Sequence, residues 1–238
     1  MSEPHRKAPA RRLPPLLRAG LLTTTAAAVL VAGTPMAASA AVRADRPRSA
    51  PAVTVHTTSA ISTASPIRTR DFQVAFDVRQ FGDLVGAGAD NRAIASSRFC
   101  DGSLHCSSVA LSFQIVTMGG DHRHLHTDNV SRATNNHCTG CQTLAGAYQF
   151  VLDTPEPIAL GPETLRRLGE VEAALRAARN QSPQTLRATV DGLVSQVVTI
   201  LGDAAAAHAA APVRTAVAVP ARTGVTLNRT LDGWPAGS

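Results

Sequence analysis

The pattern of apolar and polar residues predicts strands in the middle of the chain. Residues 72–78 alternate between Phe or Val and polar or small residues, and residues 109–117 repeat this alternation. A period of two residues is typical of a strand with one buried face. In the second strand one face is bulky and the other is mostly small, so we expect the small face to lie close to another layer of structure.

Two glycine-rich segments in the same region predict turns. The segment 82–90 carries three glycines, which interrupt the strand pattern. The pair Gly119-Gly120 is a two-residue hairpin signal. We therefore expect the chain to return after it as a neighbouring antiparallel strand.

Two segments further along predict a helical hairpin over residues 158–208. The first helix begins at Pro162, and the second has Ser182 as its N-cap with Pro183 directly after it. Apolar residues recur every three or four positions in each segment, which marks one face for burial. We expect these faces to pack on the sheet or on each other, and a partner or dimer surface is the alternative.

Two parts of the central region resemble each other. Residues 106–116 align without gaps on residues 141–151 at an offset of 35, and residues 90–100 align on residues 128–138 at an offset of 38. The change of offset falls between the cysteines of each copy. We interpret this as an internal duplication, and it favours a strand over a helix for the ambiguous segment 144–151.

The distribution of aromatic residues suggests where the packed domain lies. All six phenylalanines and the one tyrosine lie between positions 72 and 150, so residues 71–154 should form a Cys-containing β domain. Residues 41–70 have no sustained apolar period and predict a flexible spacer. Residues 209–238 are rich in Ala, Pro, Val and Thr and predict a disordered tail with Trp234 exposed.

The first 40 residues are typical of a signal peptide. A basic start precedes the apolar run Ala19–Ala32, and Ala38-Ser39-Ala40 has the small residues of a cleavage site. We expect cleavage near Ala40 and a secreted, extracellular chain, with a retained anchor as the alternative.

Loss of the leader would change the charge of the protein. It removes five of the 23 basic residues and one of the 17 acidic residues, which leaves a net charge of +2. The basic character of the whole chain therefore owes much to the leader, and we expect no nucleic-acid partner.

An even number of cysteines in an exported chain is typical of disulfides. The repeat favours pairing Cys100 with Cys106 and Cys138 with Cys141, so that each copy closes on itself, and pairing across the copies is the alternative. A redox dithiol at the Cys-x-x-Cys of the second copy and a zinc site of four thiolates are further interpretations.

The most specific polar cluster is formed by His122, His124 and His126. Alternate residues of a strand project from one face, and imidazoles on one face can bind zinc or copper. A solvated hairpin edge explains the same residues without a metal. The sequence favours this second interpretation and no cofactor, with zinc or copper as the alternative.

The common catalytic motifs do not occur in the sequence. It has no His-Glu-x-x-His, Gly-x-Ser-x-Gly or Walker loop, and no Gly-x-Gly-x-x-Gly opens a helix. The repeated Asp-Asn pairs and the equivalent residues Gln114 and Gln149 form no recognised acid–base set. Repeated amides more often satisfy backbone groups in a turn or sheet, so we predict no catalytic residue.

Two segments carry a resemblance to other proteins. CSSVALSFQIV (106–116) and NNHCTGCQTLAGAYQFV (135–151) resemble a module of uncharacterised exported bacterial proteins, over residues 72–154. Some of these proteins carry the label peptide zinc metalloprotease, but this chain lacks a metalloprotease motif and the activity is not carried over. The resemblance implies export and a common fold, and no catalytic residue.

The sequence thus predicts an α+β fold: a small duplicated, disulfide-stapled β-sheet unit followed by an α-helical hairpin, with disordered termini. The function it favours is a secreted, non-catalytic binding or structural module whose partner is a cell-envelope component or another exported protein. The alternative is a metal-binding or thiol-redox protein that uses His122, His124 and His126 or the pair Cys138 and Cys141.

The leader gives a first testable prediction. The mature chain should begin near Ala41, because Ala38 and Ala40 present the small side chains that signal peptidase requires. N-terminal sequencing of the secreted protein measures this. Recovery of intact Met1 in a membrane fraction would show instead that the apolar run is an anchor.

Overall fold

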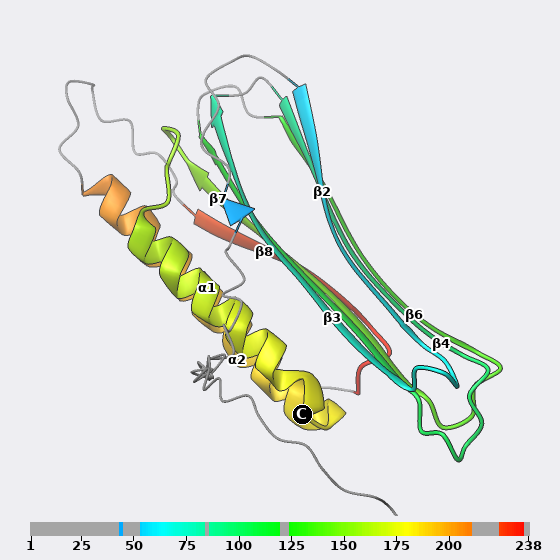
Figure 1. Ribbon diagram of the computed structural model, residues 1–238. Coiled ribbons are helices and arrows are strands. Elements are labelled where there is room, and N and C mark those ends of the chain that lie inside the picture. The colour runs from blue at the N-terminus through cyan, green and yellow to red at the C-terminus, as the bar shows by residue number, and fades with distance from the viewer. Residues whose placement is uncertain (1–42, 45–52, 84–85, 120–123, 211–223, 236–238) are drawn as a thin grey trace, which may run out of the picture. The chain divides into compact units, whose positions relative to one another are not determined.

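Successive strands alternate between two sheets, except that the last two strands are neighbours in one sheet. The computed structural model describes residues 43–44, 53–83, 86–119, 124–210 and 224–235, and its elements are labelled in Figure 1. These elements are β1 (Arg43–Ala44), β2 (Val53–Ala64), β3 (Arg70–Asp83), β4 (Gly86–Arg98), β5 (Ser107–Gly119), β6 (Leu125–Asn136), β7 (Gln142–Thr154), α1 (Pro162–Ala177), the 3₁₀ turn η1 (Ala178–Asn180), α2 (Pro183–Ala209) and β8 (Gly224–Asp232).

The strands wind as the coils of a parallel β-solenoid. One sheet has the order β2-β4-β6 and the other has the order β1-β3-β5-β7-β8. The neighbours among β2, β4 and β6, and among β3, β5 and β7, are parallel. Parallel strands need a long crossover, and here each crossover is a strand of the opposite sheet. The described part of the chain therefore makes three coils, each with one strand in either layer (Figure 1).

The register of the strands matches the offsets of the sequence alignment. Pairing of β5 with β7 places residues 35 positions apart side by side, such as Gln114 beside Gln149. Pairing of β4 with β6 places residues 38 positions apart side by side, such as Asn91 beside Asn129. Equivalent residues of successive coils therefore stack along the axis of the solenoid. A duplication as the origin of this pattern stays a prediction.

Small side chains fill the space between the two sheets. A cluster of alanines from both layers lies buried there: Ala60, Ala93, Ala95, Ala110, Ala145 and Ala147. This agrees with the expectation that the small face of the strand at 109–117 lies close to another layer. The separation is short enough for polar side chains of one sheet to reach the backbone of the other.

Buried asparagines link the sheets at one level of the stack. The side-chain amide of Asn91 donates to the carbonyl of Ser112 at 3.3 Å and to Oδ1 of Asn129 at 2.9 Å. One coil further, the amide of Asn129 donates to the carbonyls of Ala147 at 3.1 Å and Asn228 at 2.9 Å. Each amide thus satisfies a backbone carbonyl of the facing sheet, as expected for the repeated Asp-Asn pairs.

Buried glutamines do the same from the opposite sheet. The amide of Gln114 donates to the carbonyl of Asp90 at 3.0 Å, and the amide of Gln149 donates to the carbonyl of Ala89 at 2.7 Å. The Gln149 amide also donates to Oε1 of Gln114 at 2.7 Å. Amide ladders of this kind form only when identical residues stack in register, so they fix the alignment of the coils.

The other face of the larger sheet carries the apolar core. Phe76, Phe113 and Tyr148 form a row across β3, β5 and β7, with ring centroids 5.8 and 4.6 Å apart. The Tyr148 hydroxyl is buried and has no hydrogen-bond partner among the described residues, and burial raises the pKa of its phenol. Aromatic rows of this size supply much of the buried area that holds the helices on the sheet.

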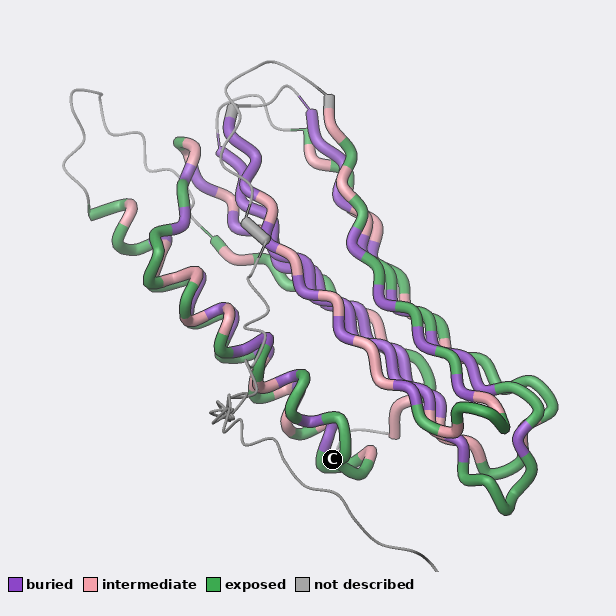
Figure 2. Tube along the Cα trace, in the orientation of Figure 1, coloured by how far each residue is buried: buried purple, intermediate pink, exposed green. Residues whose placement is uncertain are grey.

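The helical hairpin covers this apolar face, as the sequence predicted. Ser182 caps α2 by accepting a hydrogen bond from the backbone N–H of Thr185 at 3.3 Å. The inward faces of both helices are buried in Figure 2, and the following residues share the core with the sheet: Leu168, Val171, Leu175, Leu186, Val190, Val194, Val197, Ile200 and Leu201. By length and composition alone α2 could span a membrane, but its apolar stripe is used in this core.

The prediction of a disordered tail over residues 209–238 is wrong for β8. This strand pairs antiparallel with β7 and covers the end of the stack, where Asp232 accepts a hydrogen bond from the backbone of Ala133 at 2.7 Å. Trp234, expected to be exposed, is half-buried and donates from Nε1 to the carbonyl of Ala145 at 2.7 Å. The alternation of Val225, Leu227 and Leu231 with polar residues was the available signal.

The prediction of a flexible spacer over residues 41–70 is also wrong, because β2 occupies Val53–Ala64. Its inward side chains include Thr58, Ala60 and Ser62, which are small or polar and give no apolar period. The β unit therefore begins well before residue 71. The predicted signal peptide, residues 1–40, lies outside the described residues.

The hairpin expected at Gly119 does not form. Strands β5 and β6 on either side of it belong to different sheets. A Cβ added at Gly119 would lie 2.4 Å from the backbone of Glu156, so this glycine allows the segment before α1 to approach. The expected turn over 82–90 is likewise mostly strand, since β3 ends at Asp83 and β4 begins at Gly86.

The amide ladder gives a second testable prediction. The substitution Asn129→Ala removes the hydrogen-bond donor of the Ala147 and Asn228 carbonyls and the acceptor of the Asn91 amide. It should lower the free energy of unfolding by about 2–4 kcal/mol. Denaturant unfolding under non-reducing conditions measures this. The control Asn136→Ala, at the exposed end of the same strand, should change it by less than about 0.5 kcal/mol. Equal losses in both variants would contradict a structural role for the ladder.

Candidate functional site

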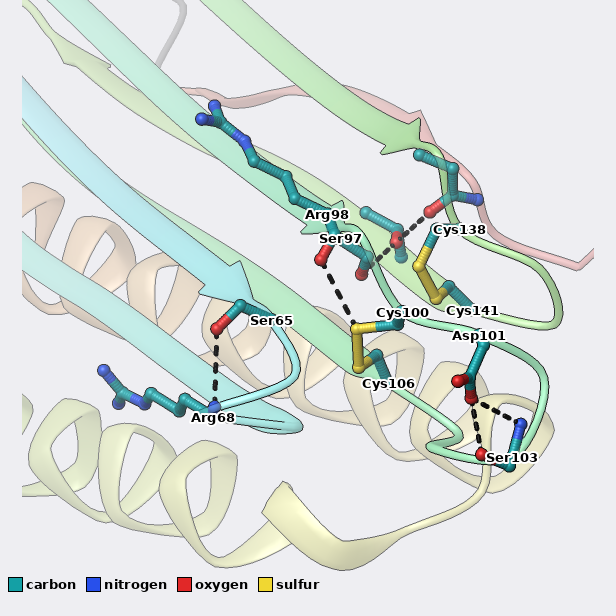
Figure 3. The surroundings of a disulfide bond; sticks show 12 residues. Ser65, Arg68, Ser97, Arg98, Cys100, Asp101, Ser103, Cys106, Cys138 and Cys141 are labelled. Atoms are coloured by element: carbon teal, nitrogen blue, oxygen red, sulfur yellow. Dashed lines mark hydrogen bonds between the residues drawn. A yellow bond between two sulfur atoms is a disulfide. The ribbon is translucent and has the colours of Figure 1, made fainter.

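Two disulfide-closed arcs lie next to each other at one edge of the solenoid, where the chain crosses from one sheet to the other (Figure 3). The first arc joins β4 to β5 and contains Cys100–Cys106, and the second joins β6 to β7 and contains Cys138–Cys141. The predicted local pairing is confirmed. The arcs are also hydrogen-bonded to each other, because the backbone N–H of Thr139 donates to the carbonyl of Cys100 at 3.1 Å.

Each cysteine follows a residue in the left-handed backbone region. The φ angles are 57° at Phe99, 44° at His105, 50° at His137 and 71° at Gly140. Three of these residues are not glycine, and each such conformation costs about 1–2 kcal/mol. The rings of Phe99 and His137 stack with centroids 5.6 Å apart, so the two arcs follow parallel paths.

A local turn orders the longer arc. The carboxylate of Asp101 accepts hydrogen bonds from the backbone N–H of Ser103 at 3.0 Å and from its hydroxyl at 2.5 Å (Figure 3). These hydrogen bonds hold the pKa of Asp101 below its ordinary value. The arc that presents His105 is therefore held by this turn as well as by its disulfide.

The sulfur atoms of the two disulfides lie close together. The Sγ atoms of Cys100, Cys138 and Cys141 are all within 4.8 Å of one another. In the oxidised protein these sulfurs are not metal ligands, because a metal site needs thiolates. If both pairs were reduced, the same positions would offer thiolates to a soft divalent metal.

A cleft of about 490 Å³ lies between the arcs and the turn that joins the two helices. Its sheet side includes Arg70, Ser107 and Gln142, which begin β3, β5 and β7 and are paired in register. Its other sides include His105 from the first arc and Arg179 from η1. Segments from all three coils and from the helical hairpin therefore meet at one cleft.

A smaller cleft of about 380 Å³ lies on the other side of Gln142. It is lined by Trp234, Leu144 and Pro183. The guanidinium of Arg187 lies 5.9 Å from the centroid of the Trp234 ring. Asn135, Thr143 and Gln184 also line this second cleft, so it combines apolar and uncharged polar side chains, in contrast to the cleft that contains the arginines.

The predicted histidine cluster is only partly described. His124 and His126 are both exposed, His126 on β6 and His124 just before it, and His122 lies outside the described residues. Zinc or copper binding by the three histidines stays a prediction.

A charged cluster at the first coil was not predicted from the sequence. His56 contacts the carboxylate of Asp77 through Nε2, and the guanidinium of Arg79 lies 2.6 Å from His56 Nδ1. Partial burial lowers the pKa of Arg79. Asp77 occupies the level at which the next coils carry Gln114 and Gln149, so this cluster replaces the amide ladder in the first coil.

The residues of the larger cleft were missed as well. Arg70 lies just before the predicted strand at 72–78, and Arg179 lies between the predicted helices. No spacing in the sequence connects the two, because they become neighbours only when the helices fold over the sheet. The cysteines beside them were the one available signal.

Comparisons with known proteins give no relative for this chain. No protein-family model, no curated protein and no solved structure matches it.

The geometry of the arcs gives a third testable prediction. Gly140→Ala should lower the free energy of unfolding by about 1–2 kcal/mol, because the left-handed conformation disfavours a Cβ even though open space surrounds it. Thermal unfolding of the oxidised protein measures the loss. The control is Gly102→Ala in the other arc, where an added Cβ also meets open space but the φ angle is not positive. This substitution should be neutral or slightly stabilising. A neutral Gly140→Ala would show that the arc can take another path.

Proposed function

We propose that the protein is a secreted, non-catalytic binding module, a disulfide-stapled β-solenoid that holds a ligand outside the cell. The observation that carries this proposal is the larger cleft, in which Arg70, His105 and Arg179 meet beside the stapled arcs. Concave sites with a few convergent polar groups are typical of ligand binding. The ligand would come from the cell envelope or from another exported protein.

The cysteines support a location outside the cytosol. All four are paired, and disulfides persist in oxidising compartments such as the extracellular space. The predicted signal peptide and the resemblance to exported bacterial proteins point the same way. Because each bridge closes a short loop, it removes little chain entropy, about 2 kcal/mol by the usual estimate. The main effect of the bridges is then to hold the arcs rigid beside the cleft.

The hydrogen bonding of the buried polar groups supports binding over catalysis. The amides of Asn91, Asn129, Gln114 and Gln149 are occupied with backbone carbonyls, and both ring nitrogens of His56 have partners. Groups held in this way stabilise the fold and are not free to move a proton. The cleft side chains, in contrast, are the ones open to a ligand.

A metal-binding or thiol-redox function is the second candidate. Its support is the proximity of the Cys100, Cys138 and Cys141 sulfurs, which is typical of a site that thiolates could share. Exchange between the two bridges would need reduction of one of them first. The histidines at positions 122, 124 and 126 are the other group that could bind zinc or copper.

Thiol and metal analysis separates these two functions and gives a fourth testable prediction. Alkylation of the secreted protein without prior reduction should add no mass, because all four cysteines are paired. Metal analysis should find no bound zinc or copper, and neither ion should raise the melting temperature.

The matched variant replaces His122, His124 and His126 with Gln. It should behave as the wild type does with and without metal. A metal-dependent rise in melting temperature that the variant loses would favour the second function, since a ligand that binds only the native state stabilises it. Alkylation of two or four cysteines would favour a redox role.

A further inference from the structure

We propose that the larger cleft binds an oxyanion, the carboxylate or phosphate group of a small ligand. This names the ligand chemistry of the binding function proposed above and rests on that function. The groups that would contact the anion are the guanidiniums of Arg70 and Arg179, the imidazole of His105 and the side-chain amide of Gln142.

The cationic side chains that line the cleft have no acidic partner among the described residues. Among the described residues, the side chains of Arg70, Arg179 and His105 make no hydrogen bond or ion pair. The one carboxylate that lines the cleft belongs to Asp71, which is buried and accepts hydrogen bonds from Arg68 at 2.6 Å and from Gln73 at 2.7 Å. Arg70 and Arg179 therefore line the cleft with exposed side chains that no acid among the described residues neutralises.

The cationic side chains of the cleft are of a type that suits an oxyanion. Both are arginines, whose planar guanidinium donates two parallel hydrogen bonds to a carboxylate or phosphate. His105 and Gln142 add N–H donors of a different geometry. A set of donors that converges from several directions is what an oxyanion with several acceptor oxygens requires.

The backbone that carries these side chains is held in place by strand pairing, a disulfide and a helical turn. Arg70 begins β3 and is paired with Ser107, whose N–H donates to the carbonyl of Thr69 at 2.8 Å. His105 is held in its left-handed conformation by the Cys100–Cys106 bridge. Arg179 lies in the 3₁₀ turn that precedes the capped start of α2. Binding would therefore order side chains and leave the backbone in place, which limits its entropic cost.

The volume of the cleft is that of a site for a small molecule. A cleft of about 490 Å³ falls within the range of small-molecule sites and exceeds the volume of a single phosphate or carboxylate. The ligand would therefore have a further part beyond its charged group. The apolar side chains of Phe72 and Val109 also line the cleft and would contact this part.

The test is a titration of the secreted, oxidised protein by calorimetry at low ionic strength. Inorganic phosphate and citrate serve as separate probes, and chloride at matched ionic strength serves as the blank. We expect saturable binding of at least one probe. Tighter binding of phosphate would identify a phosphorylated ligand, and tighter binding of citrate a carboxylate ligand. Binding of neither probe above the chloride blank would overturn the proposal.

Variants locate the site. The double variant Arg70→Gln/Arg179→Gln should weaken binding by about tenfold or more, because each lost guanidinium removes a charge-assisted pair. The control Arg132→Gln removes an exposed arginine of β6 and should change the affinity by less than about twofold. Equal weakening in control and double variant would show that only net charge matters, and would overturn the site.

His105→Asn is a milder variant, because Asn tolerates the left-handed conformation while the imidazole is lost. It should keep the melting temperature and weaken binding less than the double arginine variant does. A measurement independent of affinity is modification of arginines by phenylglyoxal, followed by peptide mass spectrometry. The bound probe should protect Arg70 and Arg179 but leave Arg132 reactive, and uniform reactivity would contradict the assignment.

Failure of this inference is distinct from failure of the proposed function. A secreted protein with both disulfides but no anion binding would leave a binding module with another ligand. Free thiols or retention in the cytosol would instead remove the secreted module, whatever the titration shows.

Discussion

The stacking of identical side chains in register is the constraint on which this structure depends. A buried amide between two sheets needs an acceptor in the facing sheet, and Asn91, Asn129, Gln114 and Gln149 each find one only because the coils are aligned. A shift of one residue would turn these amides to the opposite face and leave carbonyls unsatisfied in the interior. The polar interior thus selects one register more strictly than an apolar interior would.

A stack of this kind has two ends, and each needs a different solution. At the last coil, β8 pairs with β7 and its Asn228 carbonyl accepts the amide that would otherwise point to a fourth coil. At the first coil, the residue paired with Gln114 is Asp77, and His56, Asp77 and Arg79 form a charged cluster instead of an amide ladder. In the middle coil the buried polar groups bond to equivalent residues of the next coil, whereas at both ends they bond to other partners. This explains why neither end shows the sequence repeat.

The sequence predicted those elements that are determined by residues close to one another in the chain. The helix caps, the alternation in β5 and the short spacing within each cysteine pair are set by neighbouring residues, and the structure confirms the helices and both disulfides. Strands β2 and β8 were missed for other reasons. The inward side chains of β2 are small or polar because they line an amide-filled interior, so the apolar period that normally marks a strand is weak there. In β8 the alternation of Val225, Leu227 and Leu231 is present, but the surrounding Ala, Pro, Val and Thr composition favoured disorder. The false hairpin at Gly119 arose because a crossover between sheets and a return within one sheet carry the same glycine signal.

The same logic explains why the candidate site could not be found from the sequence. Parallel stacking places the first residues of β3, β5 and β7 in one row, so Arg70, Ser107 and Gln142 become neighbours although 35 or more positions separate each from the next. The helices cover the apolar rows that follow, but the turn at Arg179 lies over this polar row. The arcs that join the strands of one sheet to those of the other are free to differ between coils, because the amide ladder constrains only the strands. Chemistry at the arcs can therefore change without disturbing the register on which the fold depends.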